Sequence, residues 1–415
     1  MRLRFFLILG LIGLAEYYSY IAVRSAVRAM SPGWRIPLMS VYLGFTALSW
    51  AGLIFFRAIN WAEVPHLLRN LYVALVLGFV VGKILVMLVM LVDDIRRAIT
   101  WMVASMAFRN APATDAVSSV DRSTFMRQTA LVLGGLSVLG FTAGLTNRYR
   151  YRVRKVKLAF DNLPKAFKGL KIVQISDIHT GSFDEHRAVE HGIERILHQE
   201  ADIILFTGDL VNNVADEVDD RFKAIYSRLK APMGVYSTLG NHDYGDYVAW
   251  PSDAAKKENL ERLKNIHAGV GWRLLMNEHI VLERGEDRIA LIGIENWSAK
   301  ANFPKYGDMR KATDGLAEKN VPFSILLSHD PSHWRGEVLN SYKDVDLMLS
   351  GHTHGMQFGV DSKWFKWSPV QYVYDEWAGL YKEGKQHLYV NRGFGFLGYP
   401  GRLGVLPEIT VFELT

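Results

Sequence analysis

Long apolar runs fill the first third of the chain, and mixed polarity begins near Arg148. Four of these runs are almost free of charge, and they cover residues 5–23, 36–56, 68–92 and 129–145. A helix needs about 20 residues to cross the hydrocarbon core, within a range of about 17–25. Runs of this length flanked by Arg and Trp favour membrane spans over buried helices of a soluble protein. The pattern therefore predicts a transmembrane helical domain with about four spans at residues 1–147, and a second domain at 148–415.

Two charges interrupt the predicted spans, Glu16 and Lys83. Isolated charges are costly inside a bilayer. We therefore expect the two side chains to pair or to line a polar cavity, unless both lie near helix ends and reach the interface. After the third span, residues 93–108 have the spacing of an amphipathic helix at the interface. Residues 111–119 are small and polar and predict a flexible linker.

The loops on both sides of the predicted spans carry arginine, so the positive-inside rule does not decide the orientation. Residues 121–126 resemble a degraded twin-arginine export signal, with Ser123 where the second arginine belongs. On this basis we expect the second domain to be extracytoplasmic. Residues 149–154 alternate basic and other side chains. This alternation predicts a strand whose basic face is either an ordinary solvated edge or a contact to anionic headgroups.

Short apolar runs alternate with amphipathic stretches from residue 170 onward. The predicted strands cover residues 170–175, 203–206, 234–239, 288–294, 323–328, 345–349, 387–391 and 408–414. The predicted helices cover residues 186–199, 217–229 and 254–266. Strands that alternate with helices and end in a strand-rich tail predict an α/β or α+β sandwich.

Composition narrows the chemistry of this second domain. The chain has no cysteine, which excludes disulfides, thiolate metal ligands, iron–sulfur clusters and a cysteine nucleophile. Any metal must therefore bind imidazole, carboxylate, amide or water. The net charge of +6 arises from 48 basic and 42 acidic residues, a balance unlike that of a polybasic nucleic-acid protein. We expect no nucleic-acid partner.

Metal-type side chains recur in five motifs, most of them directly after a predicted strand. They are Asp177-x-His179, Gly208-Asp209, Gly240-Asn241-His242-Asp243, His329 and Gly351-His352-Thr353-His354. Ligands bind beyond the carboxyl ends of strands in open α/β sheets, so these residues are expected to meet in one cleft. Taken singly, each of them could equally be a helix cap or a turn residue. Together they suit two divalent ions about 3.5–4 Å apart that share a carboxylate.

The five motifs, in this order, resemble the calcineurin-like metallophosphoesterase superfamily over about residues 170–415. The chain looks most like the bacterial membrane-attached branch that includes YkuE-like and YaeI-like phosphoesterases, in a subgroup with several membrane spans. The resemblance implies two facing mixed sheets flanked by helices. It also implies a bridging role for Asp209, one metal held by Asp177, His179 and His354, and a second held by Asn241, His329 and His352.

The resemblance implies that His242 is not a ligand. It would face the substrate, stabilise the phosphoryl transition state and protonate the leaving oxygen, and Asp243 would orient it. Imidazole with carboxylate and amide suits Mn best here, with Fe or Zn as alternatives. The cofactors expected are therefore two divalent metal ions.

Two further segments suggest substrate contacts. Arg392 and Arg402 lie in a glycine-rich stretch, where they are expected to clamp a phosphate or to be solvated in a surface loop. Residues 363–372 place Trp, Phe and Tyr beside Lys. This segment either docks on the bilayer and admits a lipid headgroup, or folds as an aromatic hairpin over the core.

The sequence thus predicts a membrane-anchored, two-metal phosphoesterase that hydrolyses a phosphodiester or pyrophosphate bond by attack of a metal-bridging hydroxide. The expected substrate is lipid-linked, such as a nucleotide-sugar-lipid, and the expected location is the bacterial inner membrane with several passes. The alternative is a non-catalytic receptor or scaffold that binds metal or lipid, and the intact His242 argues against it. The sequence does not indicate an oligomeric state.

Overall fold

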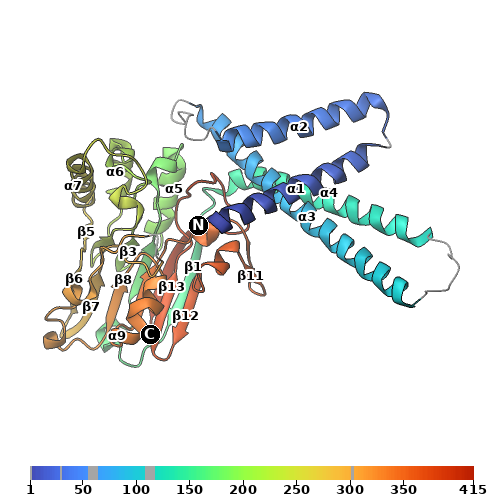
Figure 1. Cartoon of the computed structure of the whole chain (residues 1–415). Coiled ribbons are helices and arrows are strands. Elements are labelled where there is room, and N and C mark those ends of the chain that lie inside the picture. The colour runs from blue at the N-terminus through green and yellow to red at the C-terminus, as the bar shows by residue number, and fades with distance from the viewer. Residues whose placement is uncertain (1, 29, 55–63, 108–116, 301–302) are drawn as a thin grey trace. The chain divides into compact units, whose positions relative to one another are not determined.

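The chain forms two compact units, Met1–Leu145 and Thr146–Thr415. The structure is a computed structural model that describes residues 2–28, 30–54, 64–107, 117–300 and 303–415 (Figure 1). The first unit is helical and the second contains the sheets. Each unit is described separately below.

The N-terminal unit contains long helices at all four apolar runs. They are α1 (Arg2–Arg28), α2 (Pro32–Ile54), α3 (His66–Ala107) and α4 (Val117–Gly144). Within the described residues, two stretches are long and apolar enough to cross a membrane, His66–Met106 and Thr124–Asn147. The last two residues of the predicted 36–56 span, and residues 111–116 of the predicted linker, lie outside the described residues.

Helix α3 is longer than predicted, because its 42 residues are continuous. At about 1.5 Å per residue it is roughly 60 Å long, about twice the thickness of a hydrocarbon core. The prediction of a separate interfacial helix at 93–108 is therefore wrong. Helices turn sharply mainly at Pro, Gly or bulges, and α3 has neither Pro nor Gly after Gly82.

The pairing of Glu16 with Lys83 is confirmed. Lys83 Nζ lies 2.6 Å from Glu16 Oε1 and 3.1 Å from Thr46 Oγ1. Trp50 Nε1 donates to the same Glu16 oxygen over 3.1 Å. The pair thus joins α1, α2 and α3, and neither charge is left alone among apolar side chains.

The strands described in the C-terminal unit form two six-stranded sheets and a two-stranded hairpin. The first sheet has the order β1-β14-β2-β3-β4-β5, with strands β1 (Arg152–Leu158), β14 (Glu408–Leu414), β2 (Lys171–Ile175), β3 (Ile203–Thr207), β4 (Val235–Thr238) and β5 (Arg273–Leu274). The second has the order β12-β13-β9-β8-β7-β6, with strands β12 (Gly379–Glu383), β13 (Gln386–Val390), β9 (Leu347–Ser350), β8 (Ser324–Leu327), β7 (Asp287–Gly293) and β6 (Glu278–Arg284). Each sheet contains parallel and antiparallel pairs, so both are mixed.

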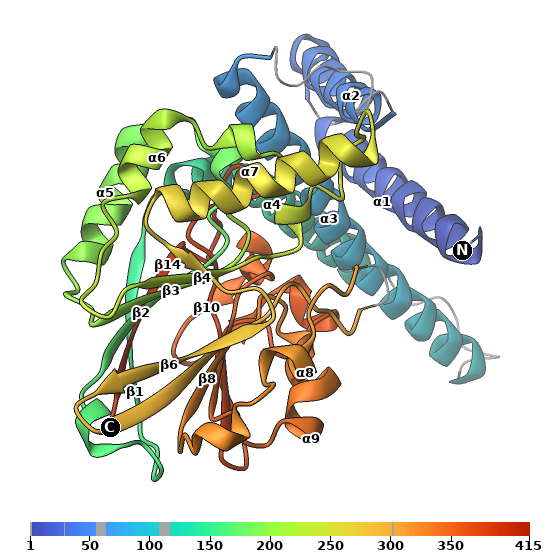
Figure 2. The same ribbon diagram turned by 90° about the vertical axis from the view of Figure 1, so that its left-hand side faces the viewer.

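The two sheets face each other across an apolar core. Ile172, Leu205 and Phe412 of the first sheet belong to the same buried cluster as Leu291 and Leu349 of the second. Helices cover the outer faces (Figure 2), namely α5 (His186–Leu197), α6 (Asp220–Tyr226) and α7 (Asp253–Gly269) on the first sheet, and α8 (Met309–Ala312) and α9 (Leu339–Ser341) beside the second. The predicted fold of two mixed sheets flanked by helices is confirmed.

Several elements differ from the predicted ones. Strands β6 and β12 were not predicted, because their side chains are mostly half-buried or exposed and their apolar runs are at most three residues long, at residues 280–282 of β6. The helix predicted at 217–229 is shorter, since α6 begins only at Asp220 and a 3-10 turn, η4 (Ala215–Glu217), precedes it. The basic stretch at 149–154 enters β1, which is an edge strand of the first sheet.

Candidate metal centre

Five strands deliver the predicted ligands to one place. Asp177 and His179 follow β2, Asp209 follows β3 and Asn241 follows β4. His329 follows β8, and the stretch from His352 to His354 follows β9. The strands β2, β3 and β4 are parallel to one another, as are β8 and β9, so their carboxyl ends share an edge within each sheet.

The first group of ligands is Asp177, His179 and His354, whose ligand atoms all lie within 4.8 Å of one another. His354 Nε2 lies 3.0 Å from His179 Nε2 and 3.3 Å from Asp177 Oδ1. All three residues are buried. Three donor atoms therefore converge on one point from two different sheets.

The second group is Asp209, His329 and His352, with the same mutual limit of 4.8 Å. His329 Nε2 lies 3.3 Å from His352 Nδ1, and Asn241 Oδ1 lies 2.7 Å from that same His352 nitrogen. Asp209 Oδ2 lies 3.1 Å from His329 Nε2 and 3.5 Å from His179 Nε2, so one oxygen faces both groups. The structure thus brings all seven predicted ligands together in the predicted grouping, and their binding of metal stays a prediction.

Hydrogen bonds on the far side of the rings fix two of the imidazoles. His329 Nδ1 donates to the Thr207 carbonyl over 2.7 Å, because a carbonyl can only accept, and its Nε2 faces Asp209. Burial lowers the pKa of His329, but the Asp209 carboxylate outweighs this and raises the pKa to about 10. His352 Nε2 lies 2.8 Å from the Tyr374 hydroxyl, and that hydroxyl donates to Asp330 Oδ2 over 3.3 Å. Such outer contacts set the orientation and the tautomer of metal-binding histidines.

The backbone is strained at five of the seven predicted ligands. Their φ angles are left-handed: 53° at Asp177, 51° at His179, 61° at Asp209, 74° at His352 and 50° at His354. Left-handed non-glycine residues cost of order 1–3 kcal/mol each, and they cluster at functional sites. These left-handed residues direct their five side chains toward the two ligand groups. The surrounding structure must hold them in this strained conformation.

Two motif glycines let the ligand carboxylates lie against neighbouring backbone. A Cβ at Gly240 would collide with the Asp209 carboxylate, and one at Gly351 would collide with that of Asp177. Any larger residue at either position would displace a predicted ligand. Gly240 and Gly351 therefore serve close approach of the chain rather than conformational flexibility.

The chemistry of this donor set fits divalent cations. Burial lowers the pKa of His179 to about 3 and holds that of His354 well below its usual range, so both rings are neutral. Their Nε2 atoms nevertheless face each other at 3.0 Å, beside the buried carboxyl groups of Asp177 and Asp209. Buried carboxylates are costly without compensating positive charge, and a cation between these atoms would supply it.

His242 lies beside the first group and is only half-buried. Its ring centroid is 5.1 Å from that of His179, and its backbone N–H donates to Asp209 Oδ1 over 2.9 Å. Its Nδ1 lies 2.7 Å from the Asn212 carbonyl, so this nitrogen carries the proton. Among the described residues, no hydrogen-bond partner is found for the other ring nitrogen.

Asp243 does not have the position predicted for it. It was expected to orient His242, but its buried carboxylate accepts from four backbone amides, those of Asp209 (2.9 Å), Leu210 (2.8 Å), Val211 (3.2 Å) and Gly240 (2.9 Å). The Asn212 carbonyl orients His242 instead. Asp243 therefore joins the loop after β3 to the loop after β4.

Glu217 is a site residue that sequence reasoning missed. Its carboxylate accepts from the backbone amides of Gly181 (3.2 Å), Asn212 (2.5 Å), Asn213 (2.9 Å) and Val214 (3.0 Å). It thus fixes the loop whose carbonyl holds His242. A carboxylate that binds only backbone leaves no motif in the sequence.

Comparison with known proteins matches both units. Residues 170–356 match the family described as Calcineurin-like phosphoesterase, and residues 1–148 match one described as Probable Calcineurin-like phosphoesterase, transmembrane domain. The uncharacterized metallophosphoesterase YkuE of Bacillus subtilis is 31% identical over 258 residues, which cover 61% of this chain and 81% of that protein. The chain belongs to the calcineurin-like phosphoesterase family. It is therefore a membrane-associated, metal-dependent phosphoric ester hydrolase.

Two other calcineurin-like relatives extend the comparison. A transmembrane protein with a metallophosphoesterase domain from Danio rerio is 31% identical over 309 residues, which cover 73% of this chain. The match spans only 65% of that protein's length. The UDP-2,3-diacylglucosamine pyrophosphatase LpxG of Chlamydia trachomatis is 28% identical over 288 residues, covering 56% of this chain and 81% of LpxG.

The two arginines predicted to contact substrate lie inside the phosphoesterase unit. Arg392 is 3% exposed, with Nη1 2.5 Å from Glu408 Oε2 and Nε 3.0 Å from Asp361 Oδ2. Arg402 is fully buried and donates to the carbonyls of Arg392 and His354 over 2.7 and 3.2 Å. The alternative of solvated loop arginines is wrong. Phosphate contact stays a prediction, and the contacts observed are with the protein.

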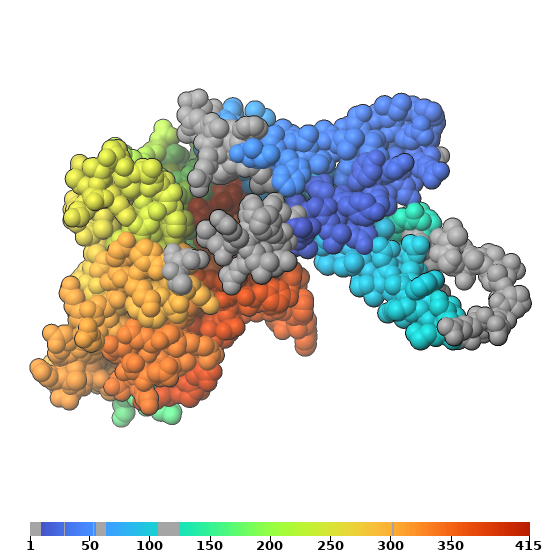
Figure 3. All heavy atoms as spheres, viewed as in Figure 1, coloured from blue at the N-terminus to red at the C-terminus, as the bar shows by residue number. Residues whose placement is uncertain are grey.

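The aromatic segment forms the hairpin of β10 (Val360–Asp361) and β11 (Lys366–Trp367). Trp364 is 95% exposed, Tyr372 is 77% exposed, and Phe365 is also exposed. Figure 3 shows the orange-red hairpin standing out from the body of the phosphoesterase unit. The alternative of an aromatic hairpin folded over the core is therefore wrong.

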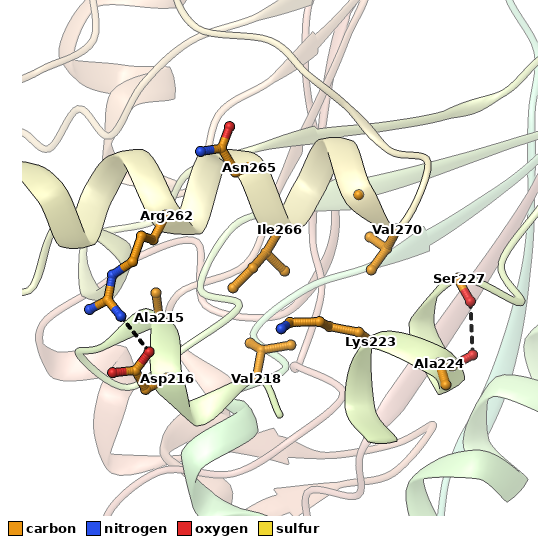
Figure 4. Close-up of a pocket in the computed structure, with 11 residues that line it drawn as sticks. Ala215, Asp216, Val218, Lys223, Ala224, Ser227, Arg262, Asn265, Ile266 and Val270 are labelled. Carbon is orange, nitrogen blue, oxygen red and sulfur yellow. Dashed lines mark hydrogen bonds and ion pairs between the residues drawn. The ribbon is translucent and has the colours of Figure 1, made fainter. Parts of the chain in front are cut away.

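A separate pocket of 670 Å³ lies between α6 and α7 (Figure 4). Its only lining carboxylate, Asp216, is paired with Arg262 over 2.6 Å, and no histidine lines it. The pocket adjoins the η4 turn, and it offers no donor set for a metal. The candidate metal site is therefore the cluster at the strand ends, and not this pocket.

Proposed function

We propose that this phosphoesterase uses two divalent cations to hydrolyse a phosphodiester or pyrophosphate bond in a lipid-linked substrate. The observation that carries the proposal is the Asp209 oxygen that faces both ligand groups. One cation would be held by Asp177, His179, His354 and Asp209, and the other by Asp209, Asn241, His329 and His352. Mn suits this mixture of imidazole, carboxylate and amide, and Fe or Zn would also fit.

The cations, when bound, supply Lewis acidity and lower the pKa of water. The residues of the chain position the reactants. His242 directs its other ring nitrogen away from Asn212. When the ring also carries a proton there, this nitrogen can donate to a phosphoryl oxygen and deliver that proton to the leaving oxygen. Hydrolysis would form one P–O bond to water and break one to the leaving group, which departs with that proton.

The exposed aromatic hairpin supports a lipid-linked substrate. Trp and Tyr favour the membrane–water interface. Tyr372 lies two residues before Tyr374, whose hydroxyl contacts His352, and the exposed Met356 lies two residues after His354. An apolar rim therefore continues directly from the segments that carry the ligands. The name of LpxG, a pyrophosphatase for a diacylated nucleotide sugar, is consistent with this substrate class.

We further propose that the chain lies in a bacterial inner membrane with the phosphoesterase unit outside the cytoplasm. An even number of spans would place the N-terminus on the same side. Protease added to intact cells should cleave the phosphoesterase unit. Protection of the unit until the membrane is opened would place it in the cytoplasm instead.

Hydrolysis of model esters by the purified full chain, with Mn added, tests the proposal. Bis-p-nitrophenyl phosphate, p-nitrophenyl phosphate and phospholipid esters would be compared. We expect turnover by the wild type, and a fall of at least about 100-fold in His242→Ala, because a proton donor is lost. Asp209→Ala should fall as far, because it removes the ligand shared by both groups. His191→Ala, on the exposed face of α5, is the matched control.

Two outcomes would contradict the proposal. Unchanged rates in both folded variants would reject the assigned roles. Tight metal binding by the wild type without turnover of any ester would favour the non-catalytic receptor. The substrate class is tested separately by Trp364→Ser with Phe365→Ser, which should lower turnover of vesicle lipids more than turnover of the soluble esters. An equal effect on both would reject the lipid role of the hairpin.

A further inference from the structure

A pocket of 490 Å³ lies in the N-terminal unit, between the end of α1 and the beginning of α2. Three arginines line it, Arg24 and Arg28 from α1 and Arg35 from α2. Apolar side chains form much of the remaining wall, with Ile36 and Met39 among them. We call this feature the arginine pocket.

The positive charge of the arginine pocket is not balanced by the protein. Within the described part of the chain, the guanidinium groups of Arg24, Arg28 and Arg35 form no ion pair or hydrogen bond. The sequence itself has no Asp or Glu from residue 17 to residue 62. Elsewhere in the same unit, Arg96 lies 2.7 Å from Asp93 and Arg97 lies 3.6 Å from Asp94. A pocket with three unneutralised guanidinium groups is suited to an anion.

The position of the pocket along the helices indicates which anion. The apolar run of α1 ends at Val23, one residue before Arg24, and that of α2 begins at Ile36, one residue after Arg35. The arginines therefore lie where apolar sequence gives way to charge, at the depth of lipid headgroups. Ile36 and Met39 continue from the pocket along the apolar part of α2, where acyl chains would pack. A free phosphate would make no use of this apolar wall.

We propose that the arginine pocket binds the phosphate headgroup of an anionic membrane phospholipid, with its acyl chains along Ile36 and Met39. Guanidinium groups match phosphate oxygens in a two-pronged geometry. Basic residues near the membrane surface each contribute about 1 kcal/mol to the attraction of anionic lipid. The site is separate from the metal cluster, so this inference does not depend on the proposed hydrolysis.

Binding of a fluorescent phosphatidylglycerol to the full chain in neutral detergent tests the proposal. We expect Arg24→Gln/Arg28→Gln/Arg35→Gln to weaken binding at least about tenfold, because three surface charges are lost. The matched control is Arg69→Gln/Arg96→Gln/Arg97→Gln, which removes the same charge from arginines that have partners in the structure. This control should bind like the wild type.

Two further comparisons keep the result interpretable if the triple variant folds poorly. The corresponding Arg→Lys triple keeps the charge but loses the two-pronged geometry, so it should bind with intermediate affinity. Phosphatidylcholine and glycerol phosphate should both bind more weakly than phosphatidylglycerol. Equal weakening in the pocket variant and the control would overturn the proposal, as would equal affinity for glycerol phosphate, which would indicate a site for free phosphate.

Discussion

The Asp243 carboxylate lies at the junction of two loops, one that carries Asp209 and one that carries His242. It is fully buried, and it accepts backbone amides from both loops. Its contribution is therefore to loop geometry, although it belongs to the same motif as His242.

Replacement of Asp243 by Asn should loosen both loops, because an amide group cannot accept four hydrogen bonds as a carboxylate does. An unsatisfied buried donor costs about 1–3 kcal/mol. We expect Asp243→Asn to lower the thermal unfolding midpoint of the full chain in detergent and to weaken its affinity for Mn. Asp253→Asn, exposed at the start of α7, is the control. Unchanged stability with an altered pH–rate profile would instead support direct orientation of His242.

Only some of the residues that form the candidate site could be predicted from the sequence. The grouping of the seven predicted ligands could be inferred from the sequence because imidazole and carboxylate side chains recur in short motifs with glycine. Glu217 and the Asn212 carbonyl could not, because their contacts are with backbone groups and leave no pattern. The left-handed φ angles at residues such as Asp209 and His352 were equally invisible, since they arise only in the folded loops.

At the scale of elements, α7 packs on the first sheet through a buried histidine, His267. Its Nδ1 lies 2.9 Å from Ser237 Oγ of β4, and burial lowers its pKa from 6.5 to about 3. Above pH 6.5 the ring is neutral in both the folded and the unfolded chain. Between pH 6.5 and 3 the unfolded chain binds a proton that the folded chain excludes, so the free energy of unfolding falls as the pH falls.

His267→Gln should therefore flatten the pH dependence of stability. One such histidine contributes a slope of up to about 1.4 kcal/mol per pH unit below pH 6.5. Thermal unfolding midpoints of wild type and variant, measured from pH 7 to pH 5, would give the difference in slope. His191→Gln on α5 should keep the wild-type slope. Equal slopes for His267→Gln and wild type would show that the ring is protonated in the folded chain.

The Glu16–Lys83 pair gives a second prediction for elements. Lys83→Met leaves the Glu16 carboxylate in an apolar environment, and loss of one partner of a buried pair costs about 3–5 kcal/mol. The double variant Glu16→Gln/Lys83→Met should be less destabilised than the sum of the two single variants. Thermal unfolding of all four proteins in detergent measures this coupling. Additive effects would mean that the pair does not join α1 to α3.

Secondary structure was predicted where the apolar pattern was strong. The strand predicted at 408–414 corresponds to β14, and the strand predicted at 203–206 differs from β3 by one residue. Strands β6 and β12 could not be predicted because they are the edge strands of the second sheet and bury few side chains, so their apolar pattern is weak. The continuity of α3 could not be predicted, because its sequence changes from apolar to amphipathic within a single helix.

At the scale of the whole molecule, the membrane unit and the enzyme unit match separate family descriptions, at residues 1–148 and 170–356. The sequence predicted both because each has its own local signature, long uncharged runs in one and metal-type motifs in the other. The convergence of five strand ends is different. It depends on the order of strands in two sheets, which no single segment specifies.

The proposed hydrolysis requires a pair of cations that share Asp209, and metal reconstitution tests this requirement directly. The full chain would be stripped with a chelator and titrated with Mn while hydrolysis of bis-p-nitrophenyl phosphate and bound Mn are both recorded. We predict no activity without metal, and full recovery at two Mn per chain. Asp209→Ala should neither bind two ions nor recover activity. Full activity in the stripped protein, or in Asp209→Ala, would contradict the account.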